Sequence, residues 1–484
     1  MNISTSENNL IKVAVIGGGI SGLSAANRLL EISAEQGRPI DLTLYEATAR
    51  HGGLLGTEKV GEYLVEQGGD MFVTNKPWAV DLCKRLGLED QLIETETGNR
   101  RAFVLSKGKP IEVPLGFNLM APARIWPMIA TPLLSWKAKL RMGWEYFVPP
   151  HKNIDEDESL ASFVRRRLGT EALDRLIQPL VGGIYTSDPE KLSLRATLPR
   201  FIEMEREHGS LIRAMRRQAK NSTDNRAATG ARYSLFVTLK GGLQQLLDAL
   251  REKVDLEANY QTGHRLTKIE PLEPGYRLTF DVAHSSESVV TEVDRLLITT
   301  PAPVTARLVD SFAPSLAEPL DQIDYASCAL VLSGHNVNDF DHPMDANGLV
   351  VPYVENRKVL AISFTSRKFA GRAPEGHILL RTFVGGALQP ELLLQTDDEI
   401  KQFTMAEIKD IFGLKNEPDF IEISRYEGAM PQYHVGHTER IASIQKEAAV
   451  LNGFELAGNI YEGVGIPDCI HNAEEAAKRL LATN

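Results

Sequence analysis

The chain has 484 residues, which is enough for two or three domains around a large hydrophobic core. Its 43% hydrophobic and 24% charged residues are ordinary for a globular protein, and the net charge of −11 argues against nucleic acid as a general partner and disfavours broad docking on anionic lipid. Three scattered cysteines without metal-ligand spacing, a polar N-terminus and the lack of a membrane-spanning run favour a cytoplasmic protein.

The first predicted elements are a strand, a glycine-rich turn, a helix and a second strand. Residues 11–16 form an apolar run of strand length, residues 21–30 place small and apolar side chains at helical spacing, and residues 40–45 form the second strand, with Glu46 at its end. The G-x-G-x-x-G motif between the first strand and the helix is weak evidence by itself, because glycine turns are common. In this context it indicates dinucleotide binding rather than a plain βαβ turn.

Each glycine of the motif has a physical role in binding a dinucleotide. Gly17 makes the tight turn, Gly19 lets the backbone approach a pyrophosphate, and Gly22 lets the helix pack closely on the sheet. The helix N-terminus offers free N–H groups and a positive potential to the phosphates. Glu46 can accept hydrogen bonds from a ribose diol.

The segment after the second strand narrows the choice of dinucleotide. Residues 46–53 read E-A-x-x-R-x-G-G, which resembles the flavoprotein family that includes amine oxidases, phytoene desaturases and protoporphyrinogen oxidases. The resemblance implies that Arg50, Gly52 and Gly53 lie along the FAD diphosphate and approach the isoalloxazine, whereas the alternative is an ordinary Gly-Gly loop. The cofactor we expect is therefore FAD rather than NAD.

The next stretch is expected to bring the chain under the flavin and then to form a hairpin. Residues 63–70 resemble the G-x-x-x-E-x-G strand of the same flavoproteins, and residues 78–88 have helical spacing up to a glycine stop. Residues 99–115 predict a hairpin that turns at 107–109, with Arg101 just before its first strand.

Residues 117–150 are rich in proline, tryptophan, methionine and leucine. The pieces 124–134 and 135–147 predict amphipathic helices, which could cover a hydrophobic tunnel or lie on a membrane surface. Packing on the protein's own core is the simpler interpretation of any one apolar face. The three tryptophans of this stretch nevertheless leave open a peripheral contact with the inner face of the membrane.

Further helices are predicted between 159 and 218. Residues 159–168 have helical spacing and carry three consecutive arginines that we expect to be solvated or ion-paired. Residues 171–186 predict a helix that runs into a Gly-Gly break. Residues 192–218 also look helical, with Glu205 among the acidic residues expected on the exposed side.

After a polar loop predicted at 220–231, the chain is expected to return to the dinucleotide domain. Residues 233–250 read as a strand, a Gly-Gly turn and a helix, and residues 453–481 lead through a glycine-rich motif into a final helix. A helix is predicted at 396–412. Further strands are predicted at 264–280, 289–299, 326–334, 348–353, 358–365 and 377–384.

We therefore predict an α/β fold with a discontinuous Rossmann-type FAD-binding domain, a mixed-sheet substrate domain and a helical subdomain. The expected boundaries place the FAD-binding domain at 1–90, 230–312 and 440–484, the substrate domain at 95–116 and 320–425, and the helical subdomain at 117–228.

Several motifs narrow the resemblance to the protoporphyrinogen oxidase family. They are P-L-V-G-G-I-Y at 179–185, L-K-G-G-L at 239–243 and the closing L-A-G-N-I-Y-E-G-V-G-I-P-D-C-I at 456–470, which is the most specific. The match runs nearly the whole length of the chain. There are two departures: the family often has G-D where this chain has Gly458-Asn459, and G-F-G-x-L-V-P where residues 346–352 read A-N-G-L-V-V-P.

The resemblance implies an FAD-dependent, oxygen-using oxidation of a porphyrinogen to the porphyrin by six electrons, with release of hydrogen peroxide, in heme biosynthesis. The family includes enzymes acting on protoporphyrinogen IX and bacterial ones acting on coproporphyrinogen III, and the sequence leaves this choice open. Because the flavin carries the hydride step, no catalytic side chain and no metal site are predicted. The alternatives are an amine oxidase, a carotenoid desaturase or a flavin-binding protein without turnover, and a homodimer is left open.

The resemblance also suggests four substrate-binding residues. Arg101 matches an arginine that would receive a propionate, although a surface arginine is the alternative. Gly183 matches a glycine whose backbone carbonyl faces the pyrrole nitrogens, with a helix-ending glycine as the alternative. Val350 and Phe383 match positions that sandwich the macrocycle, and ordinary core packing would explain either one alone.

The closing motif supplies the last part of the expected cofactor site. Its final helix could place its N-terminus near the flavin pyrimidine ring and stabilise negative charge there. Cys469 invites a covalent flavin link, but the resemblance assigns this motif to noncovalent FAD. The cofactor-binding residues expected from it are Gly458, Asn459, Gly463, Val464, Gly465 and Ile466.

Overall fold

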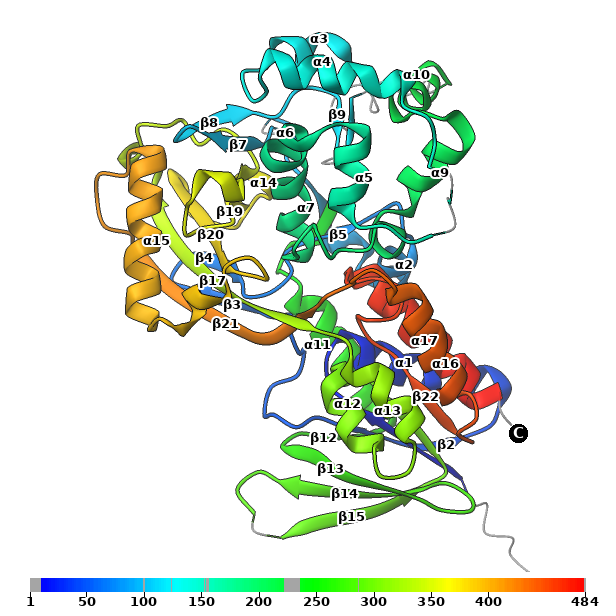
Figure 1. The fold of residues 1–484 in the computed structure, drawn as a ribbon. Helices are drawn as coiled ribbons and strands as arrows, with labels where there is room; N and C mark the ends of the chain where they lie inside the picture. Colours follow the sequence, from blue (N-terminus) through cyan, green and yellow to red (C-terminus); the bar gives the residue numbers. More distant parts are fainter. Residues whose placement is uncertain are drawn as a thin grey trace, which may run out of the picture.

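The computed structural model describes residues 10–98, 101–122, 124–151, 153, 156–221, 236–285 and 287–482. Figure 1 shows three neighbouring parts: helices at the top, a large mixed sheet flanked by one long helix at the left, and a parallel sheet with its helices below. The predicted α/β fold class is confirmed. Within the described ranges, no helix combines the length and the apolar character needed to cross a bilayer.

A five-stranded parallel sheet forms the centre of the lower part. Its strand order is β12-β2-β1-β16-β22, and every neighbouring pair is parallel. Its strands come from the start, the middle and the end of the chain, so the sheet is discontinuous in sequence. They are β1 (Ile11–Ile16), β2 (Ile40–Tyr45), β12 (Asn259–Gln261), β16 (Arg295–Ile298) and β22 (Phe454–Leu456).

Alternate residues of the sheet face two different layers. Val13 and Val15 pack against helices α1 (Ile20–Gln36), α11 (Gln244–Glu257) and α17 (Ile466–Ala482). Ala14 and Ile16 face the opposite layer, and burial on both sides explains the continuous apolar runs of the strands. That layer contains β13 (His264–Pro271), β14 (Tyr276–Val282), β15 (Ser288–Val293), α12 (Ala302–Val309), α13 (Pro314–Asp321) and α16 (His437–Ala448).

Two predicted strands in this layer are divided. The stretch 264–280 is a hairpin of β13 and β14, because Gly275, with φ of +95°, turns the chain. The stretch 289–299 splits into β15 and β16 at Asp294, whose backbone N–H donates to the carbonyl of Lys12 at 2.9 Å. In both stretches the prediction followed the apolar residues and overlooked the turn that divides the stretch into two strands.

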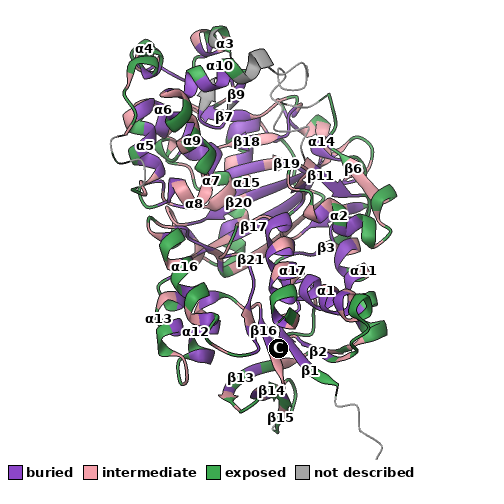
Figure 2. Ribbon diagram, turned by 90° about the vertical axis from the view of Figure 1, so that its right-hand side faces the viewer, coloured by how far each residue is buried: buried purple, intermediate pink, exposed green. Residues whose placement is uncertain are grey.

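A seven-stranded sheet forms the second part, in the order β21-β17-β20-β19-β18-β7-β8, and only β18 and β7 are parallel neighbours. Helix α15 (Asp397–Phe412) packs on one face, and Thr396 and Glu399 form a capping box at its start. The strands are β7 (Phe103–Ser106), β8 (Lys109–Glu112), β17 (Tyr325–Asn336), β18 (Gly348–Val350), β19 (Ala361–Phe364), β20 (His377–Gly385) and β21 (Phe420–Pro431). In Figure 2 much of this sheet is coloured as buried.

The helical part covers the opposite side of this sheet at its β7–β18 end (Figure 1). The stretch predicted as one helix at 192–218 is three helices, because Pro199 starts a new helix and Gly209, with φ of +66°, ends it. The predicted loop at 220–231 lies almost entirely outside the described residues. The helices are α3 (Ile125–Ala130), α4 (Trp136–Trp144), α5 (Leu160–Arg167), α6 (Thr170–Ala172), α7 (Gln178–Tyr185), α8 (Leu194–Thr197), α9 (Pro199–His208) and α10 (Leu211–Asn221).

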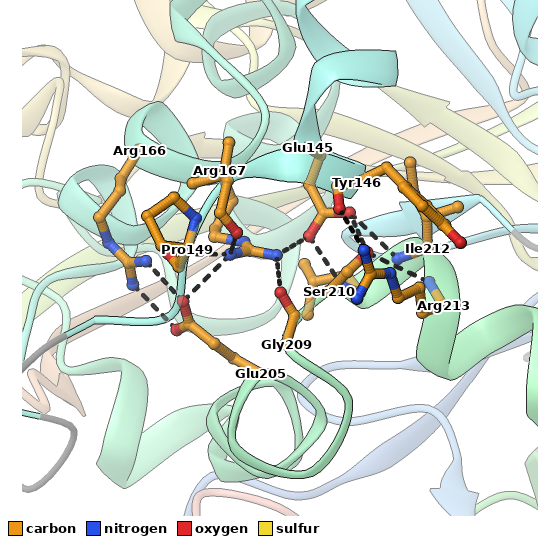
Figure 3. Close-up of polar contacts among 12 residues, drawn as sticks. Glu145, Tyr146, Pro149, Arg166, Arg167, Glu205, Gly209, Ser210, Ile212 and Arg213 are labelled. Atoms are coloured by element: carbon orange, nitrogen blue, oxygen red, sulfur yellow. Dashed lines mark hydrogen bonds and ion pairs between the residues drawn. The ribbon is translucent and has the colours of Figure 1, made fainter.

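A buried ion network holds these helices together (Figure 3). Arg167 of α5 is fully buried and pairs with Glu145 and Glu205, and Glu205 also accepts from Arg166 at 2.6 Å. Glu145 accepts from the N–H of Leu211 at 2.8 Å, at the start of α10. The arginine run is therefore ion-paired, as expected. The exposed position expected for Glu205 is wrong, because α5 packs its arginines over this carboxylate.

Shorter elements connect the three parts. They are β3 (Thr57–Val60), β4 (Tyr63–Glu66), β5 (Phe72–Val73), α2 (Trp78–Arg85), β6 (Leu92–Glu94), β9 (Phe117–Asn118), β10 (Ala121–Pro122), β11 (Phe236–Leu239) and α14 (Thr365–Lys368), with a π-helical turn η3 (Leu173–Ile177) and 3₁₀ turns η1 (Glu89–Gln91), η2 (Glu145–Phe147), η6 (Val337–Asp339), η7 (Tyr353–Glu355) and η8 (Pro390–Leu394). The domain boundaries themselves stay a prediction, since one of them falls outside the described residues.

Candidate functional site

The glycines of the turn between β1 and α1 differ in how closely other atoms approach them. A β-carbon on Gly17 would lie 2.5 Å from Thr299 Oγ1, and one on Gly22 would lie 1.8 Å from the carbonyl oxygen of Gly17. A β-carbon on Gly19 would meet nothing nearer than the Cα of Gly53, at 3.7 Å. Gly17 and Gly22 are therefore required by the fold, whereas Gly19 faces room beside the backbone.

The start of α1 suits an anionic group. Gly19 is the N-cap, so no side chain caps the helix, and its first turn holds no acidic residue. The first N–H groups of a helix have no intrahelical partners, and the helix dipole makes this end positive. The lack of a side chain at Gly19 and these N–H groups fit the diphosphate of a dinucleotide.

Glu46 is held at the end of β2 beside the same turn. Its carboxylate accepts from the N–H of Gly18 at 2.7 Å and from the N–H and hydroxyl of Thr48 at 2.8 Å each. The hydroxyl of Tyr260, on the neighbouring β12, is buried without a hydrogen-bond partner, and a β-carbon on Gly18 would lie 2.5 Å from it. Sequence reasoning missed Tyr260, because only the parallel pairing of β12 with β2 brings it here.

The loop after Glu46 is locked onto the glycine turn. The N–H of Gly52 donates to the carbonyl of Gly18 at 2.7 Å. Gly52 and Gly53 have φ of +102° and +60°, which side chains rarely adopt. The guanidinium of Arg50 donates to the carbonyls of Gly53 and Leu55. Arg50 therefore shapes this loop, and its contact with a diphosphate stays a prediction.

The closing motif lies at the same edge of the parallel sheet. β22 leads into α17 as β1 leads into α1, and both helices begin beyond the carboxyl ends of their strands, where ligands of such sheets bind. Gly458 donates to Oδ1 of Asn472 at 3.0 Å, and the Tyr433 hydroxyl donates to the carbonyl of Asn459.

Inside the motif, the backbone approaches the helix closely. A β-carbon on Gly463 would lie 2.6 Å from Oδ2 of Asp468, and one on Gly465 would lie 3.0 Å from the same atom. Val464 packs on the core of the helical part, and Ile466 packs on the core shared with α1. The motif thus joins the parallel sheet to the helical part.

Three of the four expected substrate residues come together on one side of the mixed sheet. Val350 pairs with Ala361 in neighbouring strands, and Ala361 pairs with Phe383 in the next, so these three side chains share a face. A β-carbon on Gly183, in α7, would lie 3.8 Å from Cγ1 of Val350. Gly183 is exposed, and Val350 and Phe383 are half-buried. These three residues are therefore the ones on this face that the substrate prediction concerns, and their contact with a substrate stays a prediction.

Similarity to known proteins agrees with this geometry. Residues 20–481 match the flavin-containing amine oxidoreductases. The chain belongs to this family. It is 33% identical to coproporphyrinogen III oxidase of Bacillus subtilis, over 97% of both chains, and 25% identical to chloroplastic/mitochondrial protoporphyrinogen oxidase 2 of Arabidopsis thaliana, over 97% of this chain and 94% of that one. A solved structure from Exiguobacterium sp. 255-15, provisionally described as a protoporphyrinogen oxidase, matches with a TM-score of 0.85 at 28% identity, over 98% of this chain and 99% of that one.

Membership in this flavoprotein family assigns a flavin cofactor, and the resemblance to porphyrinogen oxidases is confirmed. In this setting Cys469 is the cysteine next to the expected cofactor. Burial raises the pKa of its thiol to about 12. A thiol of that pKa is protonated at neutral pH and is a poor nucleophile.

Arg101, the fourth residue predicted to bind substrate, lies outside the strands that hold Val350 and Phe383. It lies two residues before β7, and its guanidinium pairs with Asp345. Both side chains are about two-fifths exposed, at 40% and 39%. The structure thus places a cation at the margin of the mixed sheet, already paired with a carboxylate that a substrate carboxylate could replace.

Sequence reasoning missed a buried charge cluster between the mixed sheet and the short strands β4 and β11. Lys368 Nζ lies 2.6 Å from Oδ2 of Asp70, and a guanidinium nitrogen of Arg381 lies 2.9 Å from the same atom. Arg372 lies 3.8 Å from Glu66. The five residues come from three separate segments, 66–70, 368–372 and 381, so no local pattern signals the cluster.

Proposed function

We propose that this flavoprotein is an FAD-dependent porphyrinogen oxidase of heme biosynthesis, with coproporphyrinogen III as its first candidate substrate. The observation that carries the proposal is the similarity to B. subtilis coproporphyrinogen III oxidase, at 33% identity over 97% of both chains. The A. thaliana protoporphyrinogen oxidase is more distant, at 25% identity. The face formed by Gly183, Val350 and Phe383 supports a flat macrocyclic substrate.

The proposed chemistry assigns positioning to the protein. FAD, when bound, supplies the acceptor for a hydride from a bridging carbon of the porphyrinogen, while a pyrrole nitrogen loses a proton. Three such rounds remove six electrons, and dioxygen would reoxidise the cofactor and leave as hydrogen peroxide. The carbonyl of Gly183 would orient the pyrrole N–H groups, and Val350 and Phe383 would hold the ring. Arg101 would exchange Asp345 for a propionate.

We also propose that FAD is held without a covalent bond. The residues that would hold the diphosphate, the ribose and the pyrimidine ring are the glycine turn, Glu46 and the start of α17. The raised pKa of Cys469 supports this, because a thioether link needs a reactive thiolate. Acid precipitation of the purified protein should therefore release all of the flavin into the supernatant.

The direct test is anaerobic mixing of the purified yellow protein with coproporphyrinogen III and, separately, with protoporphyrinogen IX. Loss of the oxidised-flavin absorbance with coproporphyrinogen III, followed on admission of air by porphyrin fluorescence and peroxide, is the expected result. Bleaching with protoporphyrinogen IX alone would reverse the substrate assignment. No bleaching with either would refute the proposal and favour an amine, a polyene or a non-catalytic role.

We further propose that the helical part makes a peripheral contact with an anionic membrane at its cytoplasmic face. Trp126, Trp136 and Trp144 are 79%, 68% and 63% exposed. An apolar groove of about 340 Å³, lined by Met142, Phe147 and others, opens beside them. Lys139 and Arg216 also line this groove, and Arg213 lies over the ring of Tyr146, which lines it too.

Charge and anchoring support this contact. The only carboxylate between residues 124 and 151 is Glu145, which is buried, and a second carboxylate, that of Glu171, accepts from the backbone N–H and hydroxyl of Ser135 beside Trp136. Arg213 lies over the ring of Tyr146, and Lys139 over that of Trp136 (Figure 3 shows the first pair). Tryptophans and basic residues are typical of interfacial helices.

Sedimentation with vesicles tests the contact. The protein should sediment with vesicles of phosphatidylglycerol and phosphatidylcholine but not with pure phosphatidylcholine. The W136S/W144S variant should stay in solution, whereas L394S, which removes an equally exposed apolar residue elsewhere, should behave as wild type. Concentration-dependent self-association through the same tryptophans, without vesicle binding, would contradict the proposal and assign the face to a homodimer.

A further inference from the structure

Five charged side chains are buried between segments of the mixed sheet and the short strands β4 and β11. Glu66 and Asp70 follow the flavin-binding loop, and Lys368, Arg372 and Arg381 come from the mixed-sheet side. None of these side chains is more than 11% exposed. Charges this deeply buried are costly unless they are well compensated, so their balance is informative.

The contacts in the cluster leave its charge unbalanced. Asp70 is shared by Lys368, at 2.6 Å, and Arg381, at 2.9 Å. Arg372 donates to the carbonyls of residues 239 and 240 at 2.8 and 2.9 Å, with Glu66 at 3.8 Å. Three cations thus face two carboxylates, and the Nε atoms of both arginines are buried without partners.

The two carboxylates titrate differently. Burial raises the pKa of Glu66 to about 7, although its partners oppose this shift. Burial would also raise the pKa of Asp70, but Lys368 and Arg381 lower it below its ordinary value. Near neutral pH, Glu66 is therefore partly protonated while Asp70 stays charged. The excess of positive charge is at least one unit.

The cluster lies between the expected flavin loop and the substrate-facing strand. A β-carbon on Gly69 would lie 3.1 Å from Leu55 and 3.5 Å from Ile466, residues of the two segments assigned to the cofactor. Arg381 donates to the carbonyl of Gly68. It precedes Phe383 by two residues on β20, so both point to the same face of the sheet.

We propose that Lys368, Arg372 and Arg381 form a cationic support that favours the reduced flavin and so raises its reduction potential. Each hydride that leaves the substrate brings two electrons to the cofactor, and a buried positive charge nearby offsets the negative charge that accumulates there. The three residues are positioning residues, since they act through their electrostatic field and through the loop at Gly68, and do not touch the reacting atoms. The inference rests on the proposed function for its cofactor.

Two substitutions, one that removes a positive charge and one that removes a negative charge, test the electrostatic effect of the cluster on the flavin. In purified holoenzyme, Lys368→Met should lower the population of reduced flavin at a fixed potential at least tenfold, which is about 30 mV for a two-electron couple. Asp70→Asn should shift the potential in the opposite direction, because it removes a negative charge from the same pair. The control is Lys415→Met, which breaks an exposed ion pair with Asp341 and should leave the potential unchanged. The readout is a reductive titration against a reference dye.

Two further variants guard against a folding artefact. Lys368→Arg keeps the charge and should keep the potential, and the double variant D70N/K368M removes the pair together and should bind FAD with a potential between those of the single variants. Equal potentials in all FAD-loaded variants, or shifts of one sign in both single variants, would overturn the inference. Loss of FAD from Lys368→Met and Lys368→Arg alike would make the cluster structural and would also overturn it. The dye titration needs no porphyrinogen, so its failure is distinct from failure of the proposed substrate.

Discussion

Substitutions at Gly22 and at Gly19, three residues apart, should change different properties: the first the stability of the fold, the second the affinity for flavin. Gly22→Ala places a β-carbon 1.8 Å from the carbonyl oxygen of Gly17. That atom is backbone, so α1 must move away from β1, which should cost about 1–3 kcal/mol of unfolding free energy. A β-carbon on Gly19 would make only an ordinary contact with Gly53, at 3.7 Å, and Gly19 has φ of −77° and ψ of −177°, an extended conformation that valine accepts. The fold should therefore tolerate the larger substitution at Gly19.

Flavin binding should be more sensitive to the substitution at Gly19 than to the one at Gly22. Valine at Gly19 fills the room beside the helix N-terminus, so the flavin Kd should rise at least tenfold, or about 1.4 kcal/mol. The assays are the flavin absorbance per protein after purification and the urea midpoint of the flavin-free protein. Gly143→Ala, in α4 with no atom within 4 Å, is the control and should be neutral or slightly stabilising. A Gly19→Val protein that is fully yellow, or a Gly22→Ala protein as stable as wild type, would refute the reasoning.

Three further predictions concern charged and titrating groups. Arg101→Ala should raise KM for the porphyrinogen several-fold while flavin content stays at the wild-type level; unchanged kinetics would remove Arg101 from the site. Arg167→Met leaves Glu145 buried without its cation and should cost about 3–5 kcal/mol in urea unfolding, so a loss below 1 kcal/mol would contradict the network. Burial lowers the pKa of His335 and of His437 to about 4, so the unfolded chain binds more protons. Stability is then present above pH 6.5 and lost as pH falls toward 4, and the double variant with glutamine at both positions should lose less over this window.

The local parts of the site could be predicted from the sequence. The turn at Gly17 to Gly22, the strand before it and the acidic residue after β2 depend on neighbours within a few dozen residues, and each leaves a pattern in the chain. The hairpin of β7 and β8 and the capped helix α15 are similar cases. The prediction that Val350 and Phe383 sandwich a macrocycle came from the family resemblance and stays a prediction, whereas the register through Ala361 puts both side chains on one face of the sheet.

The parts that failed depend on distant partners. β21 was missed because its twelve residues mix charged, polar and apolar types, and it is a strand through its pairing with β17. Tyr260 and the cluster around Asp70 are visible only once separate segments are assembled. Glu205 was misplaced because a helix surface looks exposed until an arginine from another helix covers it.

The order of the parallel sheet has a consequence for how the protein is made. Only β16 lies between β1 and β22 in the sheet, although more than 400 residues separate β1 and β22 in the sequence. On the ribosome, the glycine turn emerges several hundred residues before its counterpart at Gly463. Translation at about 5–20 residues per second leaves the first half of the pocket waiting tens of seconds for the second. We therefore expect flavin capture to wait until both segments are made, so a stop codon shortly before Gly463 would abolish the holoenzyme although most of the polypeptide is made.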